Sequence, residues 1–291
     1  MSEQIQIRRA TPQDRPKLSI SLDHADHVFY HLDWSSPLDW VGKQPFWVAE
    51  DTLGIRAALA LIEDPASVAW LRIYACRRGV LPDEHWKTLF AKSLADFNPN
   101  TLPTIAALGL KEWLIPLLKD AGFDYHQAVV TLYRELEGSE NILPVPPFIF
   151  IRPMEEEDLP QVAAIDQQAF EPIWQNSLSQ IEVSFQRAHY ATVAEVDDQI
   201  VGFQISTSNV FSIHLARLAV HPSYMRRKIG YALVADLIQR CRRDQYGELS
   251  VNTQDNNLAS LSLYQKIGFQ QSGQSFSVWI YKAADLQQLD K

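Results

Sequence analysis

The sequence predicts an α/β protein of two tandem domains, each a central twisted mixed β-sheet flanked by helices. Three observations predict this class. Apolar runs with strand and helix periodicity alternate along the chain. Short segments of the first half recur in the second half in the same order. The length of 291 residues suits two ordinary domains better than one.

Four pairs of segments repeat at a spacing of 144 to 146 residues. They are 7–16 with 151–160, 48–50 with 193–195, 71–73 with 216–218, and 121–123 with 267–269. A period this long indicates a duplicated domain and not a solenoid, whose repeats are far shorter. The Pro-rich stretch 143–147 predicts a stiff extended connection. We therefore expect domains over residues 1–142 and 149–291, joined by a linker over 143–148.

The second half shows the alternation of elements most clearly. The polar turn Asp197-Asp198-Gln199 between two β-rich runs predicts a hairpin. Apolar residues recur at helical spacing from Ile229, and Gly268 is suited to end the last helix. Hairpins combined with strand–helix–strand crossovers imply a mixed sheet with helices on both faces. We expect strands over 148–152, 190–196, 200–206, 213–220 and 248–253, and helices from 155, from 229 and over 258–267.

Composition excludes several classes of function. The formal net charge is −9 and both halves are acidic, which argues against nucleic-acid binding. Cys76 and Cys241 match no metal or redox spacing, so no metal is expected. No apolar run approaches a membrane span, and the N-terminus has no stretch of signal-peptide length. We expect a soluble cytoplasmic protein that binds neither nucleic acid nor membrane; its oligomeric state stays open.

A basic loop over residues 224–230, Tyr-Met-Arg-Arg-Lys-Ile-Gly, lies between the strand over 213–220 and the next helix. A helix N-terminus presents unpaired N–H groups and a partial positive charge, so it attracts phosphate. Gly230 allows close approach of the backbone, and three cations add to the attraction. Taken alone, the segment is also compatible with a solvated basic turn.

A second motif follows on the last helix. It consists of Asn257, Ser260, Leu263, Tyr264, Gly268 and Phe269. Together with the loop, this motif resembles the GCN5-related N-acetyltransferase (GNAT) superfamily over nearly all of residues 149–285. In that family the acetyl-CoA loop has Gln or Arg, two residues, Gly, one residue, then Gly or Ala. The pattern falls on 225–230, where Gly230 matches and Met225 and Lys228 depart from it.

The resemblance implies roles for named residues. The pantetheine arm of acetyl-CoA would pair with the strand backbone, the loop and helix start would hold the diphosphate, and Asn257 would contact the cofactor. Tyr264 would protonate the departing thiolate, although an aromatic at this helical spacing is also typical of a core. The implied cofactor-binding set is Leu218, Ala219, Val220, Arg226, Arg227, Lys228, Ile229, Gly230, Tyr231 and Asn257.

The general base is not identified by the sequence. His214 lies in the strand before the loop, His221 stands beside a proline at its end, and Glu171 lies in the irregular segment before residue 186. An ordered water bonded to strand carbonyl groups is a fourth possibility. The role is therefore left open at this point.

The first half keeps the pattern of elements and lacks the motifs. Residues 74–84 contain one Gly, a Pro and two acids where the phosphate loop would lie, and residues 114–121 lack the Tyr. We expect a degenerate domain that binds no acetyl-CoA and forms one wall of the acceptor site. Trp34, Trp40 and Trp47 suit a core or a pocket.

Two functions of different classes follow from the resemblance. The first is an acetyl-CoA-dependent N-acetyltransferase that acts on a primary amine of a small molecule or peptide by direct attack. The second is a non-catalytic acyl-CoA-binding regulatory module. The sequence does not identify the acceptor.

Overall fold

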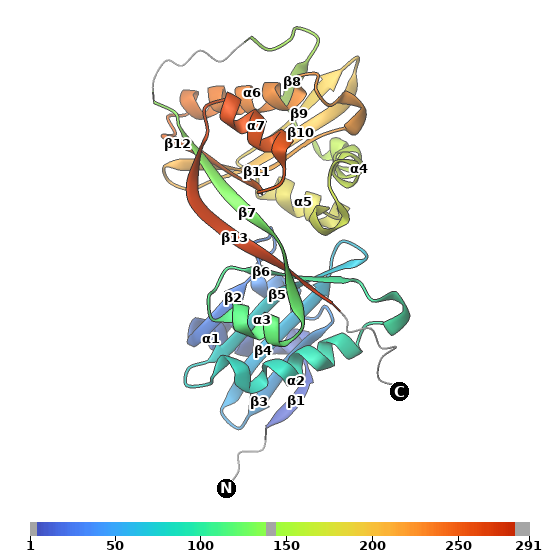
Figure 1. Cartoon of the computed structure of the whole chain (residues 1–291), viewed down its shortest axis with the longest axis vertical. Coiled ribbons are helices and arrows are strands. Elements are labelled where there is room, and N and C mark those ends of the chain that lie inside the picture. Colours follow the sequence, from blue (N-terminus) through green and yellow to red (C-terminus); the bar gives the residue numbers. More distant parts are fainter. Residues whose placement is uncertain (1–4, 138–143, 283–291) are drawn as a thin grey trace. The chain divides into compact units, whose positions relative to one another are not determined.

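A computed structural model describes residues 5–137 and 144–282 of the chain, arranged in two compact units (Figure 1). Unit 1 comprises Met1–His126 and Phe276–Lys291, and unit 2 comprises Gln127–Ser275. Each unit is a mixed β-sheet with helices packed on it, which confirms the predicted fold class. Leu143 of the predicted linker lies outside the described residues, and residues 144–149 form neither helix nor strand.

Unit 1 is built on a sheet in the order β1-β3-β4-β5-β6, with β2 paired to β5. All neighbours are antiparallel except β5 and β6, which are parallel. Helix α1 packs on β4 and β5, and α2 packs on β3 and β4. The elements are β1 (Gln6–Arg9), α1 (Arg15–Asp23), β2 (Ala25–Tyr30), β3 (Phe46–Asp51), β4 (Gly54–Glu63), β5 (Val68–Arg77), α2 (Pro82–Ala95), β6 (Thr104–Gly109) and α3 (Leu114–Asp120).

Unit 2 repeats this plan with strand order β8-β9-β10-β11-β12. Here β11 and β12 are the parallel pair and the other neighbours are antiparallel. The elements are β8 (Phe150–Pro153), α4 (Leu159–Ala169), α5 (Leu178–Gln186), β9 (Tyr190–Val196), β10 (Gln199–Ser208), β11 (Ser212–Val220), α6 (Ile229–Arg243), β12 (Glu248–Gln254) and α7 (Leu258–Lys266). The hairpin, the long helix and the last helix therefore lie where the sequence predicts them.

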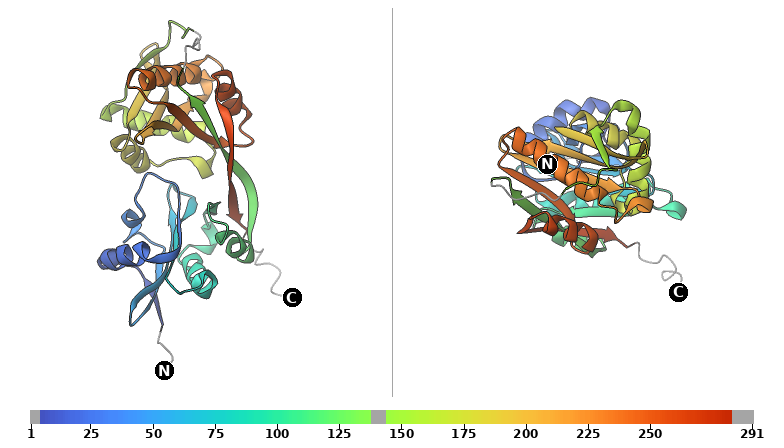
Figure 2. Two further views of the ribbon diagram at one scale, coloured as in Figure 1. Left: turned by 90° about the vertical axis from the view of Figure 1, so that its left-hand side faces the viewer. Right: turned by 90° about the horizontal axis from the view of Figure 1, so that it is seen from above.

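The two longest connecting strands each belong to both units. Strand β7 (Phe123–Glu135) begins in unit 1 and pairs with β12 in unit 2, from Val129↔Gln254 to Glu135↔Glu248. Strand β13 (Gln270–Tyr281) begins in unit 2 and pairs with β6 in unit 1. The two strands run side by side (Figure 2). Each sequence half thus supplies the last strand to the other unit, so the compact units divide the chain differently from the predicted halves.

The duplication is visible in side chains as well as in elements. In each half, an arginine on the first strand binds an aspartate six residues later and a glutamate on the neighbouring strand. The sets are Arg8 with Asp14 at 2.7 Å and Glu50 at 2.6 Å, and Arg152 with Asp158 at 2.6 Å and Glu195 at 2.8 Å. In both halves the guanidinium lowers the pKa of the aspartate carboxyl. This network explains why the first repeated segment keeps Arg and Asp at fixed positions.

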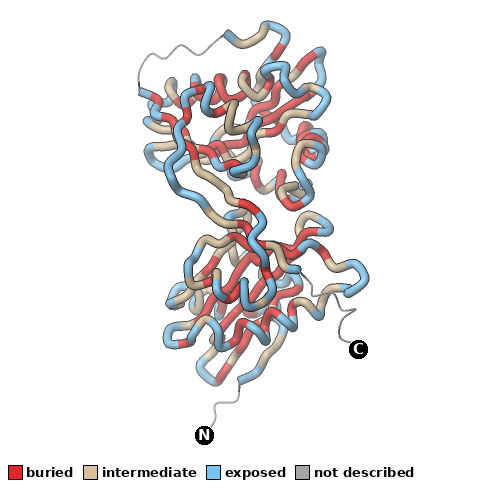
Figure 3. The backbone as a smooth tube through the Cα atoms, in the orientation of Figure 1, coloured by how far each residue is buried: buried red, intermediate tan, exposed pale blue. Residues whose placement is uncertain are grey.

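The sheet of unit 2 has a distinct helix on each face. Helix α6 packs on β9, β10 and β11, and its apolar residues form a continuous core with α7. Helix α4 packs on β10 and β11 with α5 beside it. Buried residues accordingly concentrate along the strands (Figure 3). The site described next lies where β11 and β12 separate between these two layers.

Candidate active site

Strands β11 and β12 pair over only half of their length. Their parallel register runs from Ser212↔Glu248 to Leu215↔Val251 and stops there. On its other edge β11 continues along β10 to Val220, but Ala216 is an extra residue, because Leu215 pairs with Ser206 and Arg217 with Ile205. A bulge of this kind bends a strand and increases its twist. The bulge thus accounts for the separation of β11 from β12 beyond Leu215.

The separation leaves one edge of β11 open over residues 216–220. Within the described part of the chain, no strand pairs with that edge, while β10 pairs with the other. The predicted cofactor residues Leu218, Ala219 and Val220 lie on this stretch. Alternate backbone N–H and C=O groups of such an edge are available to an extended ligand. The bulge also changes the alternation, so Leu215 and Leu218 both join the α6 core.

Gly202 allows α6 to pack closely against this strand. This role was not predicted from the sequence. A Cβ atom at Gly202 would lie 2.9 Å from the Ala219 carbonyl oxygen, 3.1 Å from Ile229 and 3.4 Å from Leu233. No other residue type fits there without displacing the backbone of β11 or the start of α6. Gly202 also follows a bulge in the β9–β10 pairing. A glycine inside a strand was the available sequence signal.

The loop before α6 adopts the conformation that glycine favours, although it contains none before Gly230. Lys228 is the N-cap residue with φ of 65°, and Arg226 has φ of 61°. Lys228 stands where the family pattern has its first Gly. Left-handed backbone costs a non-glycine residue about 1–2 kcal/mol. A strained lysine therefore stands at the N-cap of α6, where a glycine would carry no such cost.

The start of α6 has the properties of an anion site. No side chain caps the helix at Lys228, so its first amides lack the usual protein acceptor. Arg226, Arg227 and Lys228 are exposed, and none forms an ion pair with a residue that the structure describes. The Arg227 guanidinium lies 5.1 Å from the Tyr224 ring centroid. Helix dipole and three cations therefore act on the same point.

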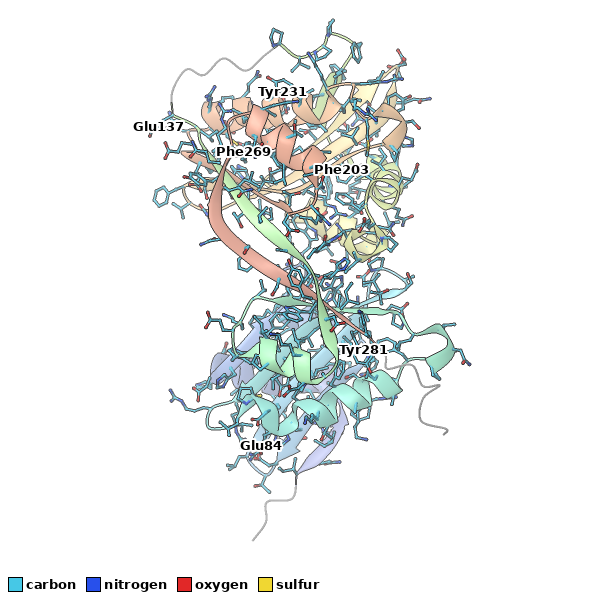
Figure 4. The ribbon with its side chains drawn as sticks, viewed as in Figure 1. Glu84, Glu137, Phe203, Tyr231, Phe269 and Tyr281 are labelled. Atoms are coloured by element: carbon cyan, nitrogen blue, oxygen red, sulfur yellow. The ribbon has the colours of Figure 1, made fainter. Side chains whose placement is uncertain are left out.

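Gly230 brings α6, α7 and β11 together. A Cβ atom at Gly230 would lie 3.3 Å from Leu263 and 3.6 Å from Val220. Ile229 is fully buried, whereas Tyr231 is half-buried against the α6–α7 core (Figure 4). The predicted residues of the helix start thus cluster at the open end of the split.

Tyr264 lies on α7 within the core beneath the split. Tyr264 is 4% exposed and belongs to the same hydrophobic cluster as Leu215 and Leu218. Its ring centroid lies 5.4 Å from that of Phe269. Burial raises the pKa of the Tyr264 phenol above its ordinary value. Among the described residues, none forms a hydrogen bond with its hydroxyl. A buried phenol normally finds a partner, so this hydroxyl is available to a ligand.

Asn257 is the N-cap residue of α7. Its Oδ1 accepts a hydrogen bond from the Ser260 amide at 3.1 Å, which caps α7, and its Nδ2 lies 3.3 Å from Gln254 Oε1. The cap explains the need for an asparagine at this position without a ligand. A contact between Asn257 and the cofactor stays a prediction.

A buried ion pair on the α4 face was not predicted. Arg217 donates to Asp166 at 2.6 and 2.7 Å and to the Trp174 carbonyl at 2.6 Å. Its guanidinium carbon lies 3.6 Å from the Phe170 ring centroid. The Asp166 carboxylate is fully buried and also accepts from the Asn176 amide at 2.8 Å. Arg217 therefore ties the segment after α4 to the open strand.

The three side chains considered as a general base have different surroundings. His221 Nδ1 accepts from the Ser223 amide at 3.2 Å and so caps the short turn before the loop. Glu171 is exposed and precedes another short turn. His214 is partly buried in β11, with Nδ1 3.0 Å from Ser250 Oγ. Of these three, His214 alone lies at the split between the strands.

Unit 1 contains a similar split, but strand β2 occupies it by pairing with β5 from Ile73 to Arg77. The pairing of β5 with β6 stops at Trp70↔Ala106. Next to it the buried rings of Tyr74 and Trp86 lie 4.8 Å apart. Helix α2 begins with two acids, and Glu84, labelled in Figure 4, pairs with Arg56 at 2.7 Å. This counterpart has neither the open edge nor the cationic helix start.

Trp40 and Trp47 of the first half have different surroundings. Trp40 belongs to the core on the α1 side, as the core interpretation predicts. Trp47 donates to Asp96 at 2.9 Å. Among residues 5–137 and 144–282, no cluster of His, Cys, Asp and Glu suited to a metal ion occurs, and no helix has the length and apolar character needed to cross a membrane.

Comparison with known proteins finds similarity over part of the second half of the chain. The profile described as "Acetyltransferase (GNAT) family" matches residues 156–269. N-acetyltransferase 8 from Homo sapiens is 33% identical over 94 residues, which cover 30% of this chain and 41% of that protein. The chain thus spans less than half the length of this curated relative.

Solved structures resemble the chain over nearly its whole length. A tandem GNAT protein from the clavulanic acid biosynthesis pathway has a TM-score of 0.66 at 13% identity, with 97% of this chain and all of that chain covered. A GCN5-related N-acetyltransferase from Sphaerobacter thermophilus has a TM-score of 0.60 at 14% identity, with 97% and 98% covered. At these identities the likeness shows a tandem GNAT fold.

Proposed function

We propose that the protein is an acetyl-CoA-dependent N-acetyltransferase acting on a primary amine, since residues 156–269 match the acetyltransferase (GNAT) family. One observation carries the proposal. In a single unit, the open edge of β11 ends at an uncapped helix start beside three unpaired cations. An extended thioester with a diphosphate at one end requires these two features in this order.

The residues at the split suit the two parts of acetyl-CoA. The backbone of Leu218, Ala219 and Val220 would pair with the pantetheine amides. The amides of Ile229, Gly230 and Tyr231, with the loop cations, would hold the diphosphate. Gly230 suits this place because its missing side chain keeps the start of α6 close to β11.

The proposed reaction is direct attack of the amine on the thioester. The amine nitrogen forms a bond to the carbonyl carbon, and the C–S bond then breaks. Backbone N–H groups at the open edge of β11 would stabilise the oxyanion. Tyr264 would give its proton to the departing sulfur. Burial supports that role, because a raised pKa keeps the phenol protonated at neutral pH.

A second candidate is an acyl-CoA-binding module without turnover. The residues at Met225 and Lys228, where the family pattern has other types, favour it. Both candidates use the same cofactor site, so binding of coenzyme A does not separate them. Transfer of the acetyl group does.

The test is thiol release from acetyl-CoA in the presence of a panel of amines, including amino acids, polyamines, aminoglycosides and peptide N-termini. We expect at least one amine to give release above the rate without amine. Tyr264→Phe should lower kcat at least tenfold and leave the Kd of acetyl-CoA, measured by calorimetry, nearly unchanged. Equal kcat values would remove Tyr264 from the acid role, and binding without release for any amine would favour the regulatory module.

A further inference from the structure

His214 lies at the mouth of the split between β11 and β12. Its partner in β12 is Ser250, one pair before the register ends at Leu215↔Val251. Ile213 and Leu215 belong to the α6–α7 core, so His214, between them, faces the opposite layer. Tyr264 belongs to the α6–α7 core. The two side chains therefore flank the split from opposite faces of the sheet.

Ser250 fixes the orientation of the His214 ring. Ser250 Oγ lies 3.0 Å from His214 Nδ1 and 3.4 Å from the Ile213 carbonyl oxygen. A hydroxyl has one proton, and a carbonyl oxygen can only accept. With the Ser250 proton donated to Ile213, Nδ1 of His214 is the donor to Oγ, and Nε2 keeps its lone pair. Among the described residues, Nε2 has no hydrogen-bond partner.

Few charged groups lie on the elements around His214. Its neighbour in β10 is Thr207, and beyond Ser250 the neighbour in β7 is Tyr133. Helix α4 carries one titratable residue, Asp166, whose carboxylate binds Arg217. On α5, Glu182 lies in a shallow groove with Glu156 and Phe185. Burial alone lowers the pKa of the His214 imidazole, so the ring is neutral at pH 7.

We propose that Nε2 of His214 is the general base that removes the proton from the acceptor amine. This inference rests on the proposed acetyltransferase function. As the C–N bond forms, the amine proton passes to His214 Nε2, the C–S bond breaks, and Tyr264 supplies a proton to sulfur. The amine approaches from the α4 face while the thiol leaves toward α7. The imidazolium then loses its proton to solvent, and Tyr264 regains one.

The direction in which kcat/KM changes with pH follows from the role of His214 as a base. Protonated His214 cannot accept a proton, so kcat/KM should rise with pH through the pKa of His214 and be level at neutral pH. Because burial holds this pKa below the ordinary value of about 6.5, the rise should lie on the acidic side of that value. Without His214, the rise should move toward the pKa of the amine itself.

The experiment compares His214→Gln with the wild type and with His126→Gln, an exposed histidine of unit 1. The rate is thiol release from acetyl-CoA with the best amine of the panel. We expect kcat/KM at pH 7 to fall about 100-fold in His214→Gln, to recover at high pH, and to recover partly with added imidazole. The Kd of acetyl-CoA and the His126→Gln rates should not change. Ser250→Ala, which keeps the ring, should give a smaller loss.

Nitrogen NMR of the imidazole rings gives a readout besides activity. At pH 7 the wild type should show His214 as the neutral tautomer with its proton on Nδ1. A proton on Nε2, or a pH profile that His214→Gln leaves in place, would overturn the base role alone. A wild type that binds coenzyme A and acetylates no amine would overturn the proposed function and the base role together.

Discussion

Replacing Arg226, Arg227 and Lys228 by alanine should weaken coenzyme A binding by about ten- to a hundredfold. The three side chains are exposed and form no ion pair with a described residue, so their removal costs little besides the contact of Arg227 with the Tyr224 ring. The helix amides at Ile229 and Gly230 remain in the variant. The loss of affinity therefore measures the cationic share of the site.

The magnitude follows from the exposure of these cations. An exposed charge near a helix end contributes about 0.5–1 kcal/mol, because solvent screens it. Three such contacts give roughly 1.5–3 kcal/mol. Each 1.4 kcal/mol changes Kd about tenfold, which gives the stated range. Raising the salt concentration should shrink the difference, since the Debye length is about 8 Å at physiological ionic strength.

The assay is calorimetric titration with two ligands, coenzyme A and acetylated pantetheine, which lacks the diphosphate. The variant should lose affinity for the first and keep its affinity for the second. A control removes the same charge elsewhere by replacing exposed Lys87, Lys111 and Lys266 with alanine. Equal losses for the two triple variants, or an unchanged Kd in the loop variant, would refute the placement of the diphosphate.

Further predictions concern residues outside the cofactor site that stabilise the fold around it. Gly202→Ala forces a Cβ to within 2.9 Å of a carbonyl oxygen, so it should destabilise the protein by about 1–3 kcal/mol in denaturant unfolding and weaken coenzyme A binding. Ala235→Gly, in a helix, would be a control that leaves the strand geometry alone. Arg217→Met leaves the buried Asp166 carboxylate unpaired and should cost about 3–5 kcal/mol; a loss below 1 kcal/mol would contradict the burial. Arg152 lowers the pKa of Asp158, so this pair stabilises the fold above the ordinary carboxyl pKa of about 4 and loses its effect as pH falls below it. Asp158→Asn should therefore lower the free energy of unfolding at pH 7 and lessen its decline in acid; parallel pH curves would count against the pair.

Features that depend on a single helix or strand could be predicted from the sequence. The apolar spacing from Ile229 gave the helix and its buried face, which the structure places over Ile229–Arg243. Gly268 was predicted to end α7 and has a positive φ of 88°. The repeated Arg and Asp of the first strand and turn also indicated the duplication, because the same ion pair recurs in both halves.

Features that depend on two distant segments were not readable. The bulge at Ala216 is one extra residue against β10, and nothing in an apolar run marks it. Arg217 and Asp166 are 51 residues apart, and either alone resembles a surface charge. The crossing of β7 and β13 between units depends on which sheet edge each long strand meets. A duplicated sequence favours boundaries between its halves, so 142 and 149 were the natural prediction.

The central claim is that unit 2 binds a nucleotide thioester along the open edge of β11 with its diphosphate at the start of α6. The measurement that tests it most directly is a crystal structure of the protein with coenzyme A at saturating concentration. The account predicts diphosphate oxygens within hydrogen-bond distance of the amides of Ile229 and Gly230, and the pantetheine beside residues 216–220. Coenzyme A bound elsewhere, or an empty split at saturation, would contradict it.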